Sequence, residues 1–158
     1  MITFFKTILI FLISFFTIMA HSKAEGDLTR KKPIEKVVFL KGNAGKEHFF
    51  EPNVLEFKTG NLYKLIIINN STSKHYFTSE GFAKAVFTRK IQVKNKKKMV
   101  AEIKGVIYEV EVFPNQFIEW WLVPIKTGKF DDLNCKVKDK ETNKKHSDMG
   151  MVGEIIIK

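Results

Sequence analysis

Short apolar stretches rich in β-branched and aromatic residues recur along the chain after residue 33, separated by polar turns. Stretches of this length, bounded by glycine, proline and asparagine, are typical of β-strands. The pattern predicts seven strands, at residues 36–40, 54–58, 62–70, 99–103, 106–113, 117–123 and 152–157. Residues 106–113 alternate in part: Val106, Tyr108, Val110 and Val112 are expected on one face, with Glu109 and Glu111 on the other. Strands at this spacing predict one antiparallel β-sandwich domain over residues 34–158.

One segment departs from the strand pattern. Between residues 80 and 90, the apolar residues Phe82, Ala85 and Val86 recur near helical spacing, and Arg89 lies close to the same face. The spacing predicts a short helix inserted between strands.

The first 24 residues differ in composition from the rest of the chain. A short basic start precedes an almost unbroken apolar run over residues 7–20, and small residues follow. This layout is typical of a secretory signal peptide, and we place its cleavage after Ala24 or Ala20. The apolar run is shorter than the roughly 20 residues of a spanning helix, which disfavours an uncleaved anchor. We therefore expect an exported protein, periplasmic or secreted, with residues 25–33 as a flexible lead-in.

Composition narrows the possible classes of protein. The chain has 158 residues, and 44% of them are hydrophobic, which excludes global disorder. It contains one cysteine, so an intramolecular disulfide and multi-cysteine zinc or iron–sulfur sites are excluded. A lone thiol in an oxidising compartment is a liability unless something occupies it, and a bound metal is one such occupant.

The chain is basic, with 27 Lys+Arg against 17 Asp+Glu and a formal charge of +10. The lysines gather in two loops, at residues 94–98 and 136–145, but arginine is scarce and no basic groove with interleaved aromatic residues is apparent. With the export signal, this argues against nucleic-acid binding. Solvated loops are the simplest interpretation, and docking on an acidic protein or on anionic lipid headgroups is the alternative.

The candidate chemistry lies near the C-terminus. Cys135 is followed by His146 and then by Met151, which together offer a thiolate, an imidazole and a thioether. Such a soft ligand set suits copper better than magnesium, calcium or manganese. A second imidazole would complete a trigonal His₂Cys plane with a weak axial methionine, and His75, at the end of an apolar strand, is the candidate. No convincing Ser/His/Asp, paired-carboxylate or phosphate-loop motif is present, which favours an electron carrier or metal-binding protein over an enzyme and leaves the choice open.

Three segments resemble the cupredoxins, the blue copper proteins of the plastocyanin and pseudoazurin type. The Phe-Glu-Pro start at residues 50–52, with a glycine turn at Gly60, is similar to the entry strand of the family. Asn69-Asn70 followed by His75 is similar to the loop that carries the first histidine ligand. His146, followed by Gly-Met-x-Gly-x-Ile at residues 150–155, resembles the closing ligand loop and last strand.

The resemblance implies a Greek-key antiparallel β-sandwich that holds one copper ion, cycling between Cu(I) and Cu(II). Carried over residue by residue, the implied ligands are His75, Cys135 and His146, with Met151 axial. Met149 competes for the axial position, but the family spacing after the histidine favours Met151.

Two features depart from the family pattern. Ten residues, 136–145, separate the cysteine from the second histidine, where the family has only a few. We expect this lysine-rich segment to be a solvated excursion. The other departure is the helical insertion after His75, which resembles a periplasmic subgroup in the stretch at residues 82–90.

Each candidate ligand also has a structural alternative. Cys135 would then be a small buried hydrophobe, His75 a loop histidine bonded to a backbone carbonyl, and Met151 an ordinary core residue. The order of the three and the Gly-Met-x-Gly context favour the metal site. His48 has no partner at a suitable spacing and is expected to be a surface histidine.

Two functions of different classes follow. The first is a one-electron carrier with a mononuclear copper site. The second is a metal-handling accessory to a membrane transporter, which delivers copper or oxidises ferrous iron. A β-sandwich that keeps the ligands but acts by protein binding is a third possibility. We expect a monomer with a redox or transporter protein as its partner, and association with a membrane is not required.

Overall fold

The structure is a computed structural model that describes residues 31–95 and 98–158. The predicted signal peptide, residues 1–24, lies outside the described residues, as does most of the predicted lead-in. The segment Lys32–Lys158 forms one compact unit. Within the described ranges, no helix is long and apolar enough to cross a membrane.

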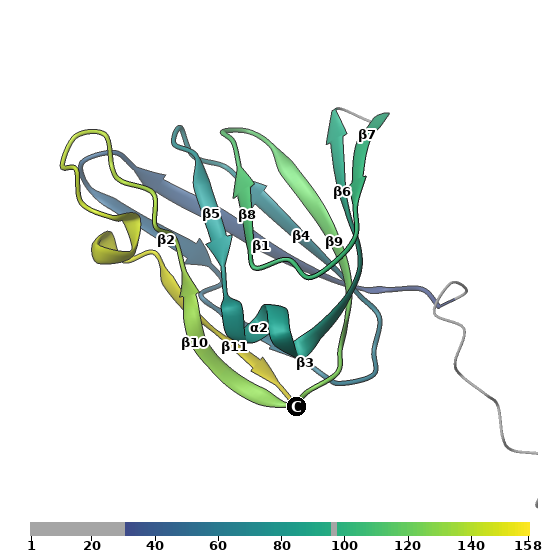
Figure 1. Ribbon diagram of the computed structural model, residues 1–158. Coiled ribbons are helices and arrows are strands. Elements are labelled where there is room, and N and C mark those ends of the chain that lie inside the picture. The colour runs from purple at the N-terminus through teal and green to yellow at the C-terminus, as the bar shows by residue number, and fades with distance from the viewer. Residues whose placement is uncertain (1–30, 96–97) are drawn as a thin grey trace, which may run out of the picture. The chain divides into compact units, whose positions relative to one another are not determined.

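Two sheets face each other as a sandwich (Figure 1). One sheet has the strand order β2-β1-β4-β9-β6-β7, and the other has the order β3-β11-β10-β5-β8. The strands are β1 (Ile34–Asn43), β2 (Glu47–Glu51), β3 (Val54–Phe57), β4 (Tyr63–Asn69), β5 (His75–Thr78), β6 (Val86–Asn95), β7 (Lys98–Ile103), β8 (Glu109–Val112), β9 (Phe117–Pro124), β10 (Gly128–Asn134) and β11 (Val152–Ile157). The predicted β-sandwich is confirmed.

Most neighbouring strands are antiparallel, but two pairs are parallel. β1 runs parallel to β4, and β3 runs parallel to β11. Both sheets are therefore mixed. The pattern along one strand carries no information about its neighbour's direction, which depends on the connections between strands.

The predicted helix is present but shorter than expected. Helix α2 (Glu80–Ala85) begins after Ser79, whose Oγ accepts a hydrogen bond from the Phe82 N–H. It ends at Ala85, and the next residue, Val86, already belongs to β6. The prediction of helix as far as residue 90 is wrong because the long strand β6, paired with β9 and β7, continues from this point.

The predicted strand at residues 106–113 is also shorter in the structure. Only Glu109–Val112 forms β8. Val112 is buried, but Val106 and Tyr108 are exposed by 62% and 50%. Val110 and Val112 do share one face of β8, which packs against the core. The expectation is wrong for Val106 and Tyr108, because the chain before Glu109 is not paired in a sheet.

The core lies between the two sheets and shows the inward alternation of a sandwich. Along β4, Tyr63, Leu65 and Ile67 are buried at every second position. Trp120 of β9 packs edge-on against Phe77 and Phe82, with ring centroids 6.3 and 5.6 Å away. This packed cluster includes Phe77 of β5, the strand that begins with the candidate ligand His75.

Candidate metal centre

Three of the four sequence-predicted ligands come from adjacent strands of the five-stranded sheet. His75 is the first residue of β5, Cys135 directly follows β10, and Met151 directly precedes β11. β10 lies between β5 and β11 and is antiparallel to both, so these three positions meet at one end of the sheet. All three side chains are buried.

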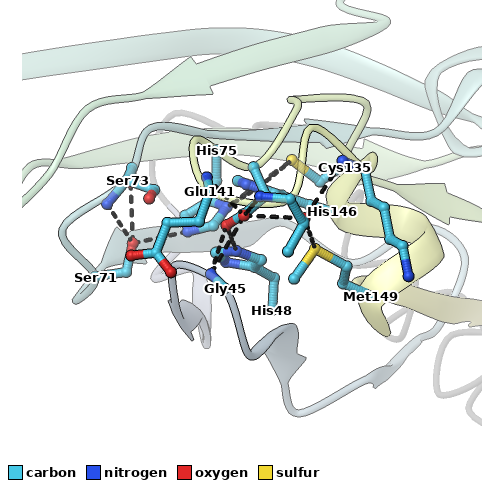
Figure 2. A network of polar contacts seen from close by, with 12 residues as sticks. Gly45, His48, Ser71, Ser73, His75, Cys135, Glu141, His146 and Met149 are labelled. Carbon is cyan, nitrogen blue, oxygen red and sulfur yellow. Dashed lines mark hydrogen bonds and ion pairs between the residues drawn. The ribbon is translucent and has the colours of Figure 1, made fainter.

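The fourth predicted ligand, His146, completes a compact donor set (Figure 2). Its Nδ1 lies 3.6 Å from the Cys135 Sγ and 3.0 Å from the His75 Nδ1. The Cys135 Sγ lies 3.9 Å from the His75 Nδ1. Ligand atoms that each lie about 2.0–2.3 Å from a shared ion are separated by about 3–4 Å. The three donors therefore fit a single transition-metal ion.

A short 3-10 helix, η2 (His146–Met149), places His146 and leads back to the sheet. Gly150 ends it at a φ of 105°, in the left-handed region that favours glycine. The Met151 N–H then donates to the His146 carbonyl (2.9 Å), and the Cys135 N–H donates to the Met151 carbonyl (3.2 Å). These backbone bonds hold the three residues in one tight loop.

The two methionines differ in their surroundings. Met151 is fully buried beside Cys135 and His146. Met149 is half-buried, and its Sδ accepts a hydrogen bond from the Thr142 Oγ1 at 3.4 Å. Met149 is thus turned toward the segment at residues 136–145, which leaves Met151 as the better candidate for the axial position.

A polar network fixes the orientation of His75. The Ser71 Oγ lies 2.7 Å from the His75 Nε2. Ser71 is held in turn by the Asn69 side chain, which accepts from the Ser71 N–H and donates to the Ser73 carbonyl. This arrangement suits the tautomer in which His75 donates its Nε2–H, leaving the Nδ1 lone pair for a metal.

Burial controls the protonation of the candidate ligands. Desolvation, followed by the neighbouring histidines His146 and His48, lowers the pKa of His75 to about 3. Desolvation and then His48 lower the pKa of His146 to about 4. Both imidazoles are therefore neutral near pH 7, the form that binds metals.

The thiol of Cys135 behaves differently. Burial raises its pKa, although the Tyr76 N–H donates to the Sγ at 3.2 Å and partly opposes this effect. Without a metal the thiol keeps its proton. Metal binding would have to displace that proton, and the Tyr76 N–H would then stabilise the thiolate.

His48 is not the surface histidine that the sequence predicts. It is fully buried on β2, and its ring stacks on that of His146 with a centroid distance of 3.6 Å and an interplanar angle of 19°. His48, His75 and His146 offer nitrogen atoms that all lie within 4.8 Å of one another. The prediction is wrong because Glu47–Glu51 forms a strand, in which His48 and Phe50 alternate inward.

The segment at residues 136–145 is only partly the solvated excursion that we predicted. Its five lysines are exposed, but it folds as a tight hairpin: the Asp139 N–H donates to the Lys144 carbonyl, and the His146 N–H donates to the Val137 carbonyl. Asp139 points inward and is buried. We call residues 136–145 the lysine hairpin.

Asp139 joins the lysine hairpin to the other sheet. One of its oxygens lies 3.0 Å from the His48 Nε2 and accepts from the Gly45 N–H, also at 3.0 Å. The other accepts from the Thr142 N–H and Oγ1. These bonds, that of His48 foremost, hold the pKa of Asp139 well below its usual range. The sequence analysis did not select Asp139, because nothing in the neighbouring residues indicates that its side chain is buried and bonded to His48.

Solved structures of copper oxidases share this architecture. A multicopper oxidase from Campylobacter jejuni, described as a metallo-oxidase, is 19% identical over 80% of this chain, with a TM-score of 0.56. A blue copper oxidase from Nitrosomonas europaea is 16% identical over 80%, with a TM-score of 0.54. A multi-copper oxidase from Pediococcus acidilactici is 15% identical over 81%, with a TM-score of 0.57. The chain has a cupredoxin-like fold.

The cupredoxin-like domain is smaller than these neighbours. The match covers 30%, 47% and 27% of the three oxidases, so the chain spans less than half of each. The sequence matches no protein-family model and no curated protein. At these identities the likeness shows the fold alone. The closer resemblance to plastocyanin and pseudoazurin, and the role of each ligand, remain predictions.

Proposed function

We propose that this protein binds one copper ion through His75, Cys135 and His146, with Met151 as a weak axial ligand, and acts as a one-electron carrier. The observation that carries the proposal is the set of three donor atoms, a sulfur and two Nδ1 atoms, separated by 3.0–3.9 Å and buried at one end of a cupredoxin-like sandwich. Such a set of thiolate and imidazole donors suits copper, and a His₂Cys set with a weak axial methionine is the arrangement of electron-transfer copper sites. Copper, when bound, supplies the Cu(I)/Cu(II) couple.

The surroundings of the site support a carrier. His75, Cys135 and His146 are fully buried and neutral, and backbone or side-chain hydrogen bonds hold each of them. A rigid, dry shell changes little when the charge of the ion changes, and apolar residues around the sulfur tune the potential. The protein residues thus provide a fixed geometry and exclude water.

A metal-handling role is the second candidate. It is favoured by the structural neighbours, which are copper oxidases and, in one case, a metallo-oxidase. In that case the site would deliver copper to a transporter or oxidise ferrous iron. The hydrogen bonds of Asp139 count against it, because they tie the lysine hairpin, which leads from Cys135 to His146, to Gly45 and His48 and so oppose opening of the site.

We propose that the protein is exported to the periplasm or secreted, acts as a monomer and docks an acidic redox partner through the lysine hairpin. The lysines of the hairpin are exposed, and within the described ranges none of them forms an ion pair. They are Lys136, Lys138, Lys140, Lys144 and Lys145. Unpaired positive charge beside a buried redox centre favours encounter with a negative surface.

The absorption spectrum of the mature protein loaded with Cu(II) tests the copper site. We expect one equivalent of copper and an intense visible band from thiolate-to-copper charge transfer, because the Cys135 Sγ lies within the donor set. Loading with Zn²⁺ should give a colourless protein with the same stoichiometry. A Cu(II)-loaded protein without the visible band would contradict the proposal.

The axial position can be tested with the two methionines. Met151→Leu should keep the colour and shift the reduction potential, because a weak axial ligand tunes the couple without forming the main bonds. Met149→Leu is the matched control and should leave the potential unchanged, since its sulfur contacts Thr142. Cyclic voltammetry of both variants measures the effect. The reverse result would assign the axial position to Met149.

A further inference from the structure

His48 and Asp139 form a buried pair beside the four proposed ligands. We propose that His48 is a positioning residue: held by Asp139, it packs flat against His146 and fixes the orientation of that imidazole for metal binding. The inference rests on the proposed function, because it treats His146 as a ligand. It adds two residues to the site that sequence reasoning did not select.

The contacts of Asp139 determine how His48 is held. The carboxylate already accepts from the backbone N–H groups of Gly45, Glu141 and Thr142. An ionised carboxylate can only accept, so the His48 Nε2, 3.0 Å away, must carry the hydrogen. The pair therefore fixes the ring plane of His48. Because Asp139 belongs to the lysine hairpin and His48 to β2, the bond also joins two separate parts of the chain.

The stacking geometry excludes His48 as a ligand of the same ion as His146. A metal binds an imidazole nitrogen in the plane of the ring. The rings of His48 and His146 are 19° from parallel with centroids 3.6 Å apart, so an ion in the plane of one ring lies well outside the plane of the other. The His48 Nε2 is also occupied by Asp139. Three histidines thus gather here, but the geometry assigns His48 to support rather than to coordination.

His146 needs such support because the usual kind is missing. A metal-binding histidine ordinarily donates its second ring N–H to a fixed acceptor, which sets the orientation of the ring. For His75, Ser71 occupies this position at 2.7 Å. The His146 Nε2 is buried and has no hydrogen-bond partner among the described residues. The flat face of His48 is therefore the contact that limits rotation of the His146 ring.

The neighbouring strand β1 leaves space for the His48 ring. Gly42 pairs with His48 in the sheet, and a Cβ at Gly42 would lie 2.4 Å from the His48 Nδ1. Gly42 has a φ of +146° and no side chain, which leaves room for the imidazole.

Three variants test the pair of His48 and Asp139. His48→Ala removes both the ring that stacks on His146 and the hydrogen bond to Asp139, whereas His48→Phe keeps a ring but loses the hydrogen bond. Asp139→Asn removes the negative charge and keeps the size of the side chain. Thr88→Val is the control. It deletes another buried hydrogen bond, from the Trp120 Nε1 to the Thr88 Oγ1 at 3.1 Å, on the β6–β9 strand pair. For each variant we would measure the copper affinity and the charge-transfer spectrum. We would also record the His146 ring signals in NMR spectra of the copper-free protein.

We expect His48→Ala to weaken copper binding by about 10–100-fold, the usual cost of removing a group that orients a ligand. Its His146 ring signals should lose the ring-current shift that His48 causes, and its visible band should move. Asp139→Asn should change the same quantities in the same direction, but by little in the His48→Ala background, because Asp139 acts through His48. His48→Phe should recover part of the His146 ring-current shift. Thr88→Val should lower the melting temperature alone.

Several results would overturn the inference. One is an unchanged His146 ring signal in folded His48→Ala or Asp139→Asn protein, which needs no copper to observe. Another is a change in copper affinity with no change in the spectrum, which would mean that the pair only covers the site. Fully additive losses in the double variant would separate Asp139 from His48. A wild-type protein that lacks the visible band but keeps the stacked His146 signals would instead contradict the proposed function.

Discussion

Cys135→Ser should abolish the intense visible absorption of the Cu(II)-loaded protein. The band requires a thiolate bound to copper, and a serine hydroxyl is a harder and much less acidic donor that cannot replace it. Cys135 is the sole cysteine of the chain, so no second thiol can restore the colour. We expect complete loss of the band and a large loss of Cu(I) affinity, measured by absorption and by competition with a chelator.

The fold should survive this substitution, which makes the result interpretable. Serine is close to cysteine in size, and its oxygen can still accept from the Tyr76 N–H, which lies 3.2 Å from the sulfur. The Cys135 backbone bonds to Met151 and Ser147 do not involve the side chain. The melting temperature of the copper-free variant provides the check. A variant that binds copper as tightly as the wild type and keeps its colour would remove Cys135 from the site.

The closeness of His75, Cys135 and His146 could be predicted from the sequence because it depends on order along the chain, whereas their role as ligands stays a prediction. The sequence places a histidine after an apolar strand, and then a cysteine, a histidine and a methionine before the last strand. These positions lie at the ends of strands, and the ends of neighbouring strands meet at one edge of a sheet. The structure brings His75, Cys135 and His146 together in this way. What the sequence could not reveal is the spacing of donors in space, which depends on the register of β5, β10 and β11.

His48 and Asp139 escaped prediction for different reasons. The alternation of His48 with Phe50 was a usable signal, but the strand is only five residues long and begins beside the polar turn at Gly45 and Lys46. Asp139 offers no such signal. Its contacts with Gly45 and His48 join residues more than 90 positions apart, and it sits among lysines that do face solvent. A local pattern of polar residues predicts that a segment is exposed to solvent, but it does not reveal that one side chain within the segment points inward.

The buried position of His146 has a consequence for electron transfer. No proposed ligand reaches the surface. The lysine hairpin adjoins the site, because it leads directly from Cys135 to His146 and is tied to Gly45 and His48 by Asp139. If the protein is the carrier that we propose, a reactant that approaches the site on this side meets the five exposed lysines. The charge of this surface is positive. We therefore expect anionic reactants to exchange electrons with the site faster than cationic ones.

Neutralising three hairpin lysines should therefore slow electron transfer to an anionic oxidant. In the variant Lys138→Gln/Lys140→Gln/Lys144→Gln, we expect Cu(I)-loaded protein to reduce hexacyanoferrate(III) about tenfold more slowly at low ionic strength, with the difference shrinking as salt rises. A cationic oxidant such as hexaammineruthenium(III) should react faster, not slower. Stopped-flow absorption at the charge-transfer band measures both rates.

The matched control is the variant Lys58→Gln/Lys98→Gln/Lys126→Gln. It lowers the net charge by the same amount, but at exposed lysines of other loops and strands. If both triple variants slow the anionic reaction equally, only net charge matters and the hairpin is not the docking surface. If only the hairpin variant responds, the anionic oxidant takes up its electron beside the lysine hairpin.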